Sequence, residues 1–179
     1  GVTHKEKVRK LKASVDTLAM SATPIPRTLN MSLMGVRDLS IINTAPVDRL
    51  PTRTFITKFD EETIRKSIES ELSRGGQVYF IHNRVQSIYA LADEIRKIVP
   101  QARIKIGHGQ MEEHELEKTM GAFFNHEVDV LICTTIVESG MDIPKANTMF
   151  IDQAHMMGLS QLYQLRGRVG RSKQRAYCY

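Results

Sequence analysis

The chain has 179 residues, of which 41% are apolar and 25% charged, with a formal net charge of +5. This length can hold one substantial core, or one domain with part of another, and no apolar run approaches the length that would span a membrane. Two cysteines, Cys133 and Cys178, are too few for a disulfide framework or a zinc site. We expect a cytoplasmic protein with reduced thiols and an anionic partner. The first residue is not methionine, which is typical of a piece of a longer protein.

The opening of the chain is interpreted as the end of a preceding domain. The expected elements are a basic helix over 5–12, a strand over 16–20, a helix over 26–34 and a short strand over 39–42. Residues 43–51 contain two prolines and no apolar periodicity, which indicates a linker. We therefore divide the chain into residues 1–45, the C-terminal part of one domain with its linker, and residues 46–179, a second domain.

From residue 54 onward, short apolar runs alternate with amphipathic stretches. The expected strands are 54–59, 78–81, 103–106, 128–133 and 148–151. Three helices are expected between them: the first is capped by Asp60 and buries Ile64, Ile68 and Leu72, the second buries Ile88, Leu91, Ala92 and Ile95, and the third buries Leu116, Met120 and Phe123. This alternation predicts an α/β fold with a mostly parallel sheet flanked by helices.

The stretch Gln161–Arg171 is the most informative part of the chain. Read as a continuous helix, it would carry one donor-rich face made of Gln161, Gln164, Arg168 and Arg171. Guanidinium groups fixed in this way can bind a polyanion such as a triphosphate bidentately. The alternative is a solvated basic helix. Gly167 and Gly170 argue against that alternative, because an exposed helix has no use for two helix-destabilising glycines.

Two further clusters follow expected strands. In the first, 21–28, Ser21 and Thr23 are better explained as helix caps than as phosphate ligands when they are taken alone. The second, 134–144, begins where the most apolar strand ends, which is where open α/β sheets bind ligands. A ligand site and an ordinary turn are about equally good explanations of its Thr, Gly, Asp and Pro residues.

Weaker signals come from two other strand ends. Asn83 and Arg84 follow one strand, and His108 follows another, so each places hydrogen-bond donors at a carboxyl edge. Either could be an ordinary turn. The histidines are poor metal candidates because no second ligand stands at a workable spacing, and we expect no metal site.

The clusters resemble the motifs of superfamily-two helicases and translocases, whose motor lobes are RecA-like. By this resemblance Arg168 and Arg171 are arginine fingers that reach the γ-phosphate of ATP, and Gln164 monitors the same phosphate. The string 134–144 is similar to the fifth motif, which implies that Asp142 lies in the ATP cleft.

The same resemblance implies a track for DNA. Its residues would be Thr134, Thr135 and Gly140 of the fifth motif, Asn83 and Arg84 of the fourth, and His108. The string 21–28 is similar to the third motif, so Ser21 and Thr23 would couple ATP to DNA, and Arg27 would contact a phosphate.

Two parts of a complete motor are missing from the sequence. It has no Gly-x-x-x-x-Gly-Lys-Ser/Thr string, so it cannot form a P-loop. The acidic pairs Asp93-Glu94 and Glu61-Glu62 fall within expected helices and not at the end of an apolar strand. We therefore expect ATP and Mg²⁺ to be bound mainly by another lobe, and the chain alone to be inactive.

Over nearly its whole length, the sequence resembles the family of bacterial transcription-repair coupling factors. The stretches 28–31 and 35–42 carry this resemblance best. It implies a double-stranded DNA translocase that displaces stalled RNA polymerase and recruits excision-repair proteins through domains outside this chain. The helical hairpin that follows the sixth motif in the family is also outside it. The alternatives are a fork-remodelling helicase and, from another class, a nucleotide-independent nucleic-acid-binding module.

Overall fold

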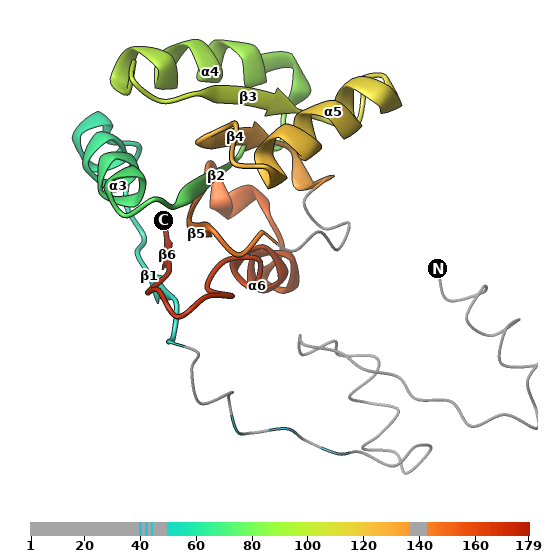
Figure 1. The fold of residues 1–179 in the computed structure, drawn as a ribbon. Coiled ribbons are helices and arrows are strands. Elements are labelled where there is room, and N and C mark those ends of the chain that lie inside the picture. The colour runs from blue at the N-terminus through green and yellow to red at the C-terminus, as the bar shows by residue number, and fades with distance from the viewer. Residues whose placement is uncertain (1–39, 41, 43, 45–49, 137–142) are drawn as a thin grey trace, which may run out of the picture. The chain divides into compact units, whose positions relative to one another are not determined.

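The computed structural model describes residues 40, 42, 44, 50–136 and 143–179. The elements expected over 5–42 and the boundary drawn at residue 45 lie outside these residues, as do Ser21, Thr23, Arg27, Gly140 and Asp142. Within residues 38–179, which group as one compact unit, the described part forms a parallel sheet with helices around it (Figure 1).

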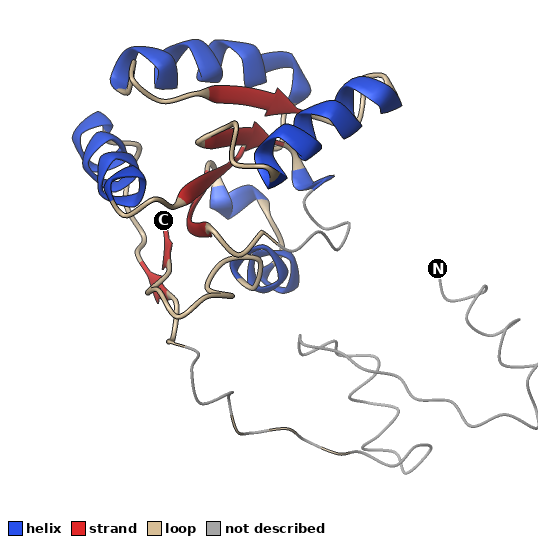
Figure 2. Cartoon of the chain, in the orientation of Figure 1, coloured by secondary structure: helices blue, strands red, loops and turns tan. Residues whose placement is uncertain are grey.

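The sheet has six strands in the order β1-β6-β5-β2-β4-β3, and every neighbouring pair is parallel. The strands are β1 (Arg53–Thr54), β2 (Gln77–Ile81), β3 (Ile104–Gly107), β4 (Val130–Cys133), β5 (Ala146–Ile151) and β6 (Tyr177–Cys178). The helices are α3 (Glu61–Ser73), α4 (Val85–Ile98), α5 (Glu113–Phe124), the short 3-10 helix η2 (Ala154–Met156) and α6 (Leu159–Arg166). Figure 2 shows the strands enclosed by these helices.

The molecule is layered because side chains alternate along each buried strand. Tyr79 and Ile81 of β2 pack in one apolar cluster with residues of α5 and α6. Val78 and Phe80, from the same strand, pack in a second cluster with residues of α3 and α4. The sheet is therefore covered on both faces, which explains why the central strands are almost continuously apolar.

Helix α3 begins where the sequence predicted. The side chain of Asp60 accepts a hydrogen bond from the Thr63 amide at 2.8 Å, as an N-cap residue does. Hydrogen bonding to the Thr63 side chain and, second, to this amide holds the pKa of Asp60 below its ordinary value. The helix ends at Ser73, and Gly75 follows with a φ of 73°. The predicted cap and end of this helix are confirmed.

Two elements differ from the prediction. The strand expected over 54–59 is reduced to Arg53–Thr54, and Ile56 beyond it is fully exposed. Strand β6 was not predicted, because Tyr177 and Cys178 are too short a stretch to form a recognisable apolar run. The two short strands pair with each other, so each owes its existence to a partner distant in sequence.

Three stacked contacts link the core to this edge of the sheet. The ring of Phe80 stacks on Phe150, Phe150 on Tyr179, and Tyr179 on Phe55, with centroids 5.1, 4.9 and 5.2 Å apart. The stack compensates for the shortness of β1 and β6, because aromatic contacts add to the few backbone hydrogen bonds there.

No helix in the described part of the chain is both long and apolar enough to cross a membrane.

Candidate nucleotide and nucleic-acid interface

The carboxyl ends of four neighbouring strands form one continuous edge. The amide of Asp152 donates to the carbonyl of Ile81 at 2.9 Å, and the amide of His82 donates to Cys133 at the same distance. The amide of Thr134 donates to Gly107 at 3.2 Å. The turns after β5, β2, β4 and β3 are therefore brought side by side, as the parallel order predicts.

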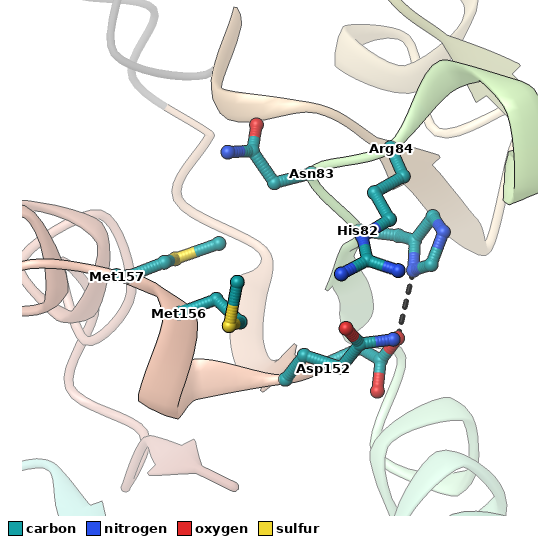
Figure 3. A pocket seen from close by; sticks show the side chains of 7 residues that line it. His82, Asn83, Arg84, Asp152, Met156 and Met157 are labelled. Atoms are coloured by element: carbon teal, nitrogen blue, oxygen red, sulfur yellow. Dashed lines mark hydrogen bonds and ion pairs between the residues drawn. The ribbon is translucent and has the colours of Figure 1, made fainter.

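A shallow pocket of about 150 Å³ opens at this edge between the turns that follow β2 and β5. Figure 3 shows His82, Asn83 and Arg84 on one side and Asp152, Met156 and Met157 on the other. Asn83 and Arg84 are exposed, so their amide and guanidinium groups are accessible to a ligand. Arg84 is also the N-cap residue of α4, and its side chain makes no capping hydrogen bond.

His82 lies beneath this pocket and is 5% exposed. Its Nδ1 is 2.7 Å from a carboxylate oxygen of Asp152, and its Nε2 is 2.7 Å from the hydroxyl of Ser87. The ring thus connects the ends of β2 and β5 with the first turn of α4.

The turn after β3 places His108 at the far end of the same edge. Its Nε2 is 3.0 Å from the hydroxyl of Tyr89, whose ring it meets edge-on. The residue is 5% exposed, and its Nδ1 has no hydrogen-bond partner. Tyr89 is exposed and belongs to α4, so His108 is held beneath an accessible phenol and is not itself accessible.

The fifth-motif threonines lie where the sequence predicted. Thr134 follows β4 directly and is buried, whereas Thr135 is half-buried in the turn that comes next. Gly140 and Asp142, which belong to the same predicted motif, fall within 137–142 and lie outside the described residues.

The predicted helix over Gln161–Arg171 is wrong in its second half. Helix α6 ends at Arg166, and Gly167 is its C-cap residue. Gln164 is exposed on the helix, whereas Arg168 and Arg171 belong to the loop after it, so the four polar side chains do not share a helical face. The periodicity misled because Leu162, Leu165 and Val169 suit a helix, although Val169 reaches the core from the loop.

The loop after α6 is anchored by its centre. Val169 is fully buried, and Gly170 has a φ of 78°. A Cβ at Gly170 would meet the hydroxyl oxygen of Thr52 at 3.0 Å and the Cβ of Ala176 at 3.1 Å. Arg168 is half-buried and Arg171 exposed on either side of this anchored pair. Gly170 therefore serves a left-handed turn packed against Thr52 and Ala176, and not close approach along a helix.

Sequence reasoning missed Asp152, Ser87 and Gln153. The signal for Asp152 was available, because it follows an expected strand in the same way that His82 does. Ser87 could not be found, since its role depends on where α4 places its first turn. Gln153 adopts a φ of 51°, a left-handed conformation that no sequence pattern indicated.

No group of three or more potential metal ligands occurs among the described residues. Both cysteines are buried and free, as expected. The orphaned Nδ1 of His108 is a single donor or acceptor and does not amount to a metal site.

The parallel sheet flanked by helices is a RecA-like lobe, as predicted. The chain belongs to the family described as helicase conserved C-terminal domain, which matches residues 60–173.

Two relatives and one solved structure sharpen this assignment, and a second solved structure shares the fold. Over all 179 residues, the chain is 56% identical to the transcription-repair-coupling factor of Bacillus subtilis and 54% identical to that of Myxococcus xanthus. It spans 15% of the length of each. A structure of RecG bound to a three-way DNA junction covers 92% of the chain at 36% identity with a TM-score of 0.74, and the match spans 22% of that protein. Dbp5 of S. cerevisiae, 17% identical with a TM-score of 0.62, shares the fold.

Proposed function

We propose that the chain is part of an ATP-dependent translocase on double-stranded DNA, a coupling factor that displaces stalled RNA polymerase and links transcription to nucleotide excision repair. The observation that carries this proposal is the 56% identity to a coupling factor over every residue of the chain. Residues 46–179 would be the second motor lobe, and residues 1–45 the end of the first. The polymerase and repair proteins would bind domains outside this chain, in the cytoplasm.

The nucleotide side of the proposal rests on the loop after α6. Arg168 and Arg171 carry planar guanidinium groups whose N–H donors suit the oxygens of a terminal phosphate. Gln164 and Asp142 would complete this side of the cleft. ATP and Mg²⁺ would be held mainly by the first lobe. When bound, ATP supplies the phosphoryl group that is transferred, while these residues bind and orient its terminal phosphate across the cleft.

The nucleic-acid side rests on the turns at the carboxyl edge. Asn83 and Arg84 are exposed there, next to the turn that carries Thr134 and Thr135. In the proposed function these groups would contact phosphate and sugar and not base edges, as a motor indifferent to sequence requires. Gly140 and Arg27 would contribute to the same track, and Ser21 and Thr23 would couple it to the nucleotide.

His108 enters this track in a modified role. Because it is buried beneath Tyr89, it would act by holding that exposed phenol toward the backbone of DNA.

The decisive experiment uses a full-length coupling factor that carries this chain as its second lobe. ATP turnover with and without duplex DNA, and release of stalled RNA polymerase, are measured for the parent and for Arg168→Ala and Arg171→Ala. Because arginine fingers contribute roughly 10³ to 10⁵ in rate, turnover should nearly vanish in both variants while DNA affinity persists. Lysine should not rescue either position, since it cannot reproduce the planar fork.

Arg96→Ala is the matched control, because Arg96 is an exposed arginine on α4, paired only with a surface aspartate in the described structure. It should leave turnover unchanged. Near-normal turnover in an Arg168 or Arg171 variant would remove that residue from the nucleotide site. DNA-independent turnover with no polymerase release would reject the translocase, and branch migration of a three-way junction instead would favour the fork-remodelling alternative.

The 179-residue chain alone should hydrolyse no ATP, because it has no P-loop. Its binding to duplex DNA should be insensitive to base sequence and weaken steeply with salt, since each neutralised phosphate releases counterions. Binding that is strong, sequence-specific and independent of nucleotide in the full-length protein would support the non-motor module instead.

A further inference from the structure

A part-buried three-residue contact links the two sides of the proposed site. His82 is 5% exposed, and the side chain of Asp152 is 17% exposed. The ring nitrogens of His82 lie 2.7 Å from Asp152 and 2.7 Å from Ser87. Neither contact is explained by the roles given above to the neighbouring residues.

The chemistry of the three groups fixes the orientation of the ring. The carboxylate of Asp152 can only accept, so Nδ1 of His82 must carry the proton and donate to it. Nε2 of a neutral ring is then an acceptor, and the hydroxyl of Ser87 donates to it. A partner on each side therefore fixes the orientation of the ring, which lines the pocket of Figure 3.

The two partners lead to opposite parts of the lobe. His82 begins the turn of Asn83 and Arg84 and, through Ser87, contacts the first turn of α4. Asp152 begins the segment that continues through the left-handed Gln153 and η2 into α6. The start of this segment is held by the Asp152 amide on the carbonyl of Ile81, and the carboxylate of Asp152 adds a side-chain contact with His82 at the same place.

We propose that His82 is a positioning residue that couples the DNA-facing turn after β2 to the segment that carries α6 and the arginine loop, which is the loop of Arg168 and Arg171. The proposal rests on the proposed function. When DNA shifts the turn of Asn83 and Arg84, the His82 ring would move with it and displace Asp152. Asp152 begins the segment that leads into α6, so its displacement would reach Gln164. The hydrogen bond between His82 and Asp152 transmits the movement, whereas the hydrogen bond between His82 and Ser87 orients the ring.

Two substitutions of His82 separate these halves. His82→Asn keeps an amide nitrogen near the position of Nδ1 and can still donate to Asp152. His82→Gln places its amide near the position of Nε2, so it can reach Ser87 but not Asp152. Both remove the ring, so loss of packing is common to the pair and only the hydrogen-bond partner differs.

The measurement is DNA-stimulated ATP turnover in the full-length coupling factor. Because a misplaced catalytic group lowers kcat more than ground-state binding, His82→Gln and Asp152→Ala should each lower DNA-stimulated kcat roughly tenfold or more, with KM for ATP changed by less than about threefold. His82→Asn should retain most of the stimulation, and Ser87→Ala should be close to the parent.

His114→Gln is the matched control, since His114 is an exposed histidine on α5. Parent-like stimulation in His82→Gln, or equal losses in the Asn and Gln variants, would overturn the inference. A rise in KM without a fall in kcat would do so too. Failure of the proposed function is distinct from all of these, because the parent protein itself would then show no stimulation by DNA.

Discussion

Gly170 lies so close to Thr52 that an added Cβ would stand 3.0 Å from the threonine hydroxyl oxygen. Gly170 also has a φ of 78°, which disfavours any side chain. The arginine loop is thus fixed against the residue that precedes β1, by backbone conformation and by contact together. This contact and the buried side chain of Val169 together hold the loop that carries Arg168 and Arg171.

Gly170→Ala should lower the free energy of unfolding by about 1–3 kcal/mol. The alanine would be strained in the left-handed conformation, and its Cβ would push against Thr52. Urea unfolding followed by circular dichroism measures this. Gly121→Ala is the matched control: Gly121 lies within α5 with nothing within 4 Å of its Cβ position, so alanine there should stabilise by up to about 1 kcal/mol. A Gly170 variant as stable as the parent would show that the loop is not anchored there.

Asp129 should contribute stability that depends on pH. Burial raises the pKa of its carboxyl, but hydrogen bonds from the side chain and backbone of Arg103 outweigh burial, and the pKa lies below its ordinary value. A lowered folded-state pKa means that the stabilisation is present above pH about 4 and is lost as the pH falls through the folded-state pKa.

Asp129→Asn should therefore lower the free energy of unfolding by about 1–2 kcal/mol at pH 7, since part of the Arg103 side chain is exposed and screened. The difference from the parent should shrink toward pH 3. Asp93→Asn, which removes one partner of the exposed pair with Arg96, is the control and should have little effect at either pH. A pH-independent cost at Asp129 would mean that packing, not charge, is responsible.

Gly76 leaves room for a buried carboxylate. A Cβ at Gly76 would overlap the Oε1 atom of Glu71, whose side chain is fully buried and contacts Arg74 and Thr148. Gly76→Ala should displace this carboxylate from its partners and cost about 3 kcal/mol, as expected when a buried ion pair is broken. In a Glu71→Ala background the same substitution should cost much less. Additive costs in the double variant would contradict this mechanism.

The two cysteines should be unreactive in the native chain. Burial raises the pKa of the Cys133 thiol far above its usual range and raises that of Cys178 to about 11. The thiolate that attacks disulfide reagents is therefore scarce near neutral pH. Labelling with a chromogenic disulfide should follow unfolding, with both thiols appearing at the same urea concentration. Rapid labelling of Cys178 without urea would reveal local opening of the β6 edge.

Most of the fold could be predicted, because runs and regular spacings of apolar residues indicate which strands and helix faces are buried. The five-residue core strand β2 and the helices α3, α4 and α5 were found in this way. The short strand β6 could not be found, and β1 was expected to be longer than it is, because the pairing of these two strands depends on residues far apart in the sequence. Helix α6 was extended too far, since the apolar spacing continued to Val169 after the helix itself had ended.

The site residues that directly follow strands could be placed from the sequence, whereas the contacts of their side chains could not. Parallel strands bring their carboxyl ends together, so Asn83, Thr134 and His108 were expected at one edge. Burial of His108 beneath Tyr89 was not foreseen, because it depends on the side-chain geometry of α4. The contact of His82 with Ser87 was not foreseen either, because it depends on where α4 places its first turn.

The position of β6 between β1 and β5 has a consequence for the order of folding. Tyr179 bonds through its backbone to Met149 and Ile151, and the amide of Phe55 donates to Cys178. During synthesis, β1 leaves the ribosome early and has no neighbour until residues 177–179 emerge. Closing so long a loop is slow, so β1 and the Phe55 ring should dock last, after β2, β3, β4 and β5 have already assembled.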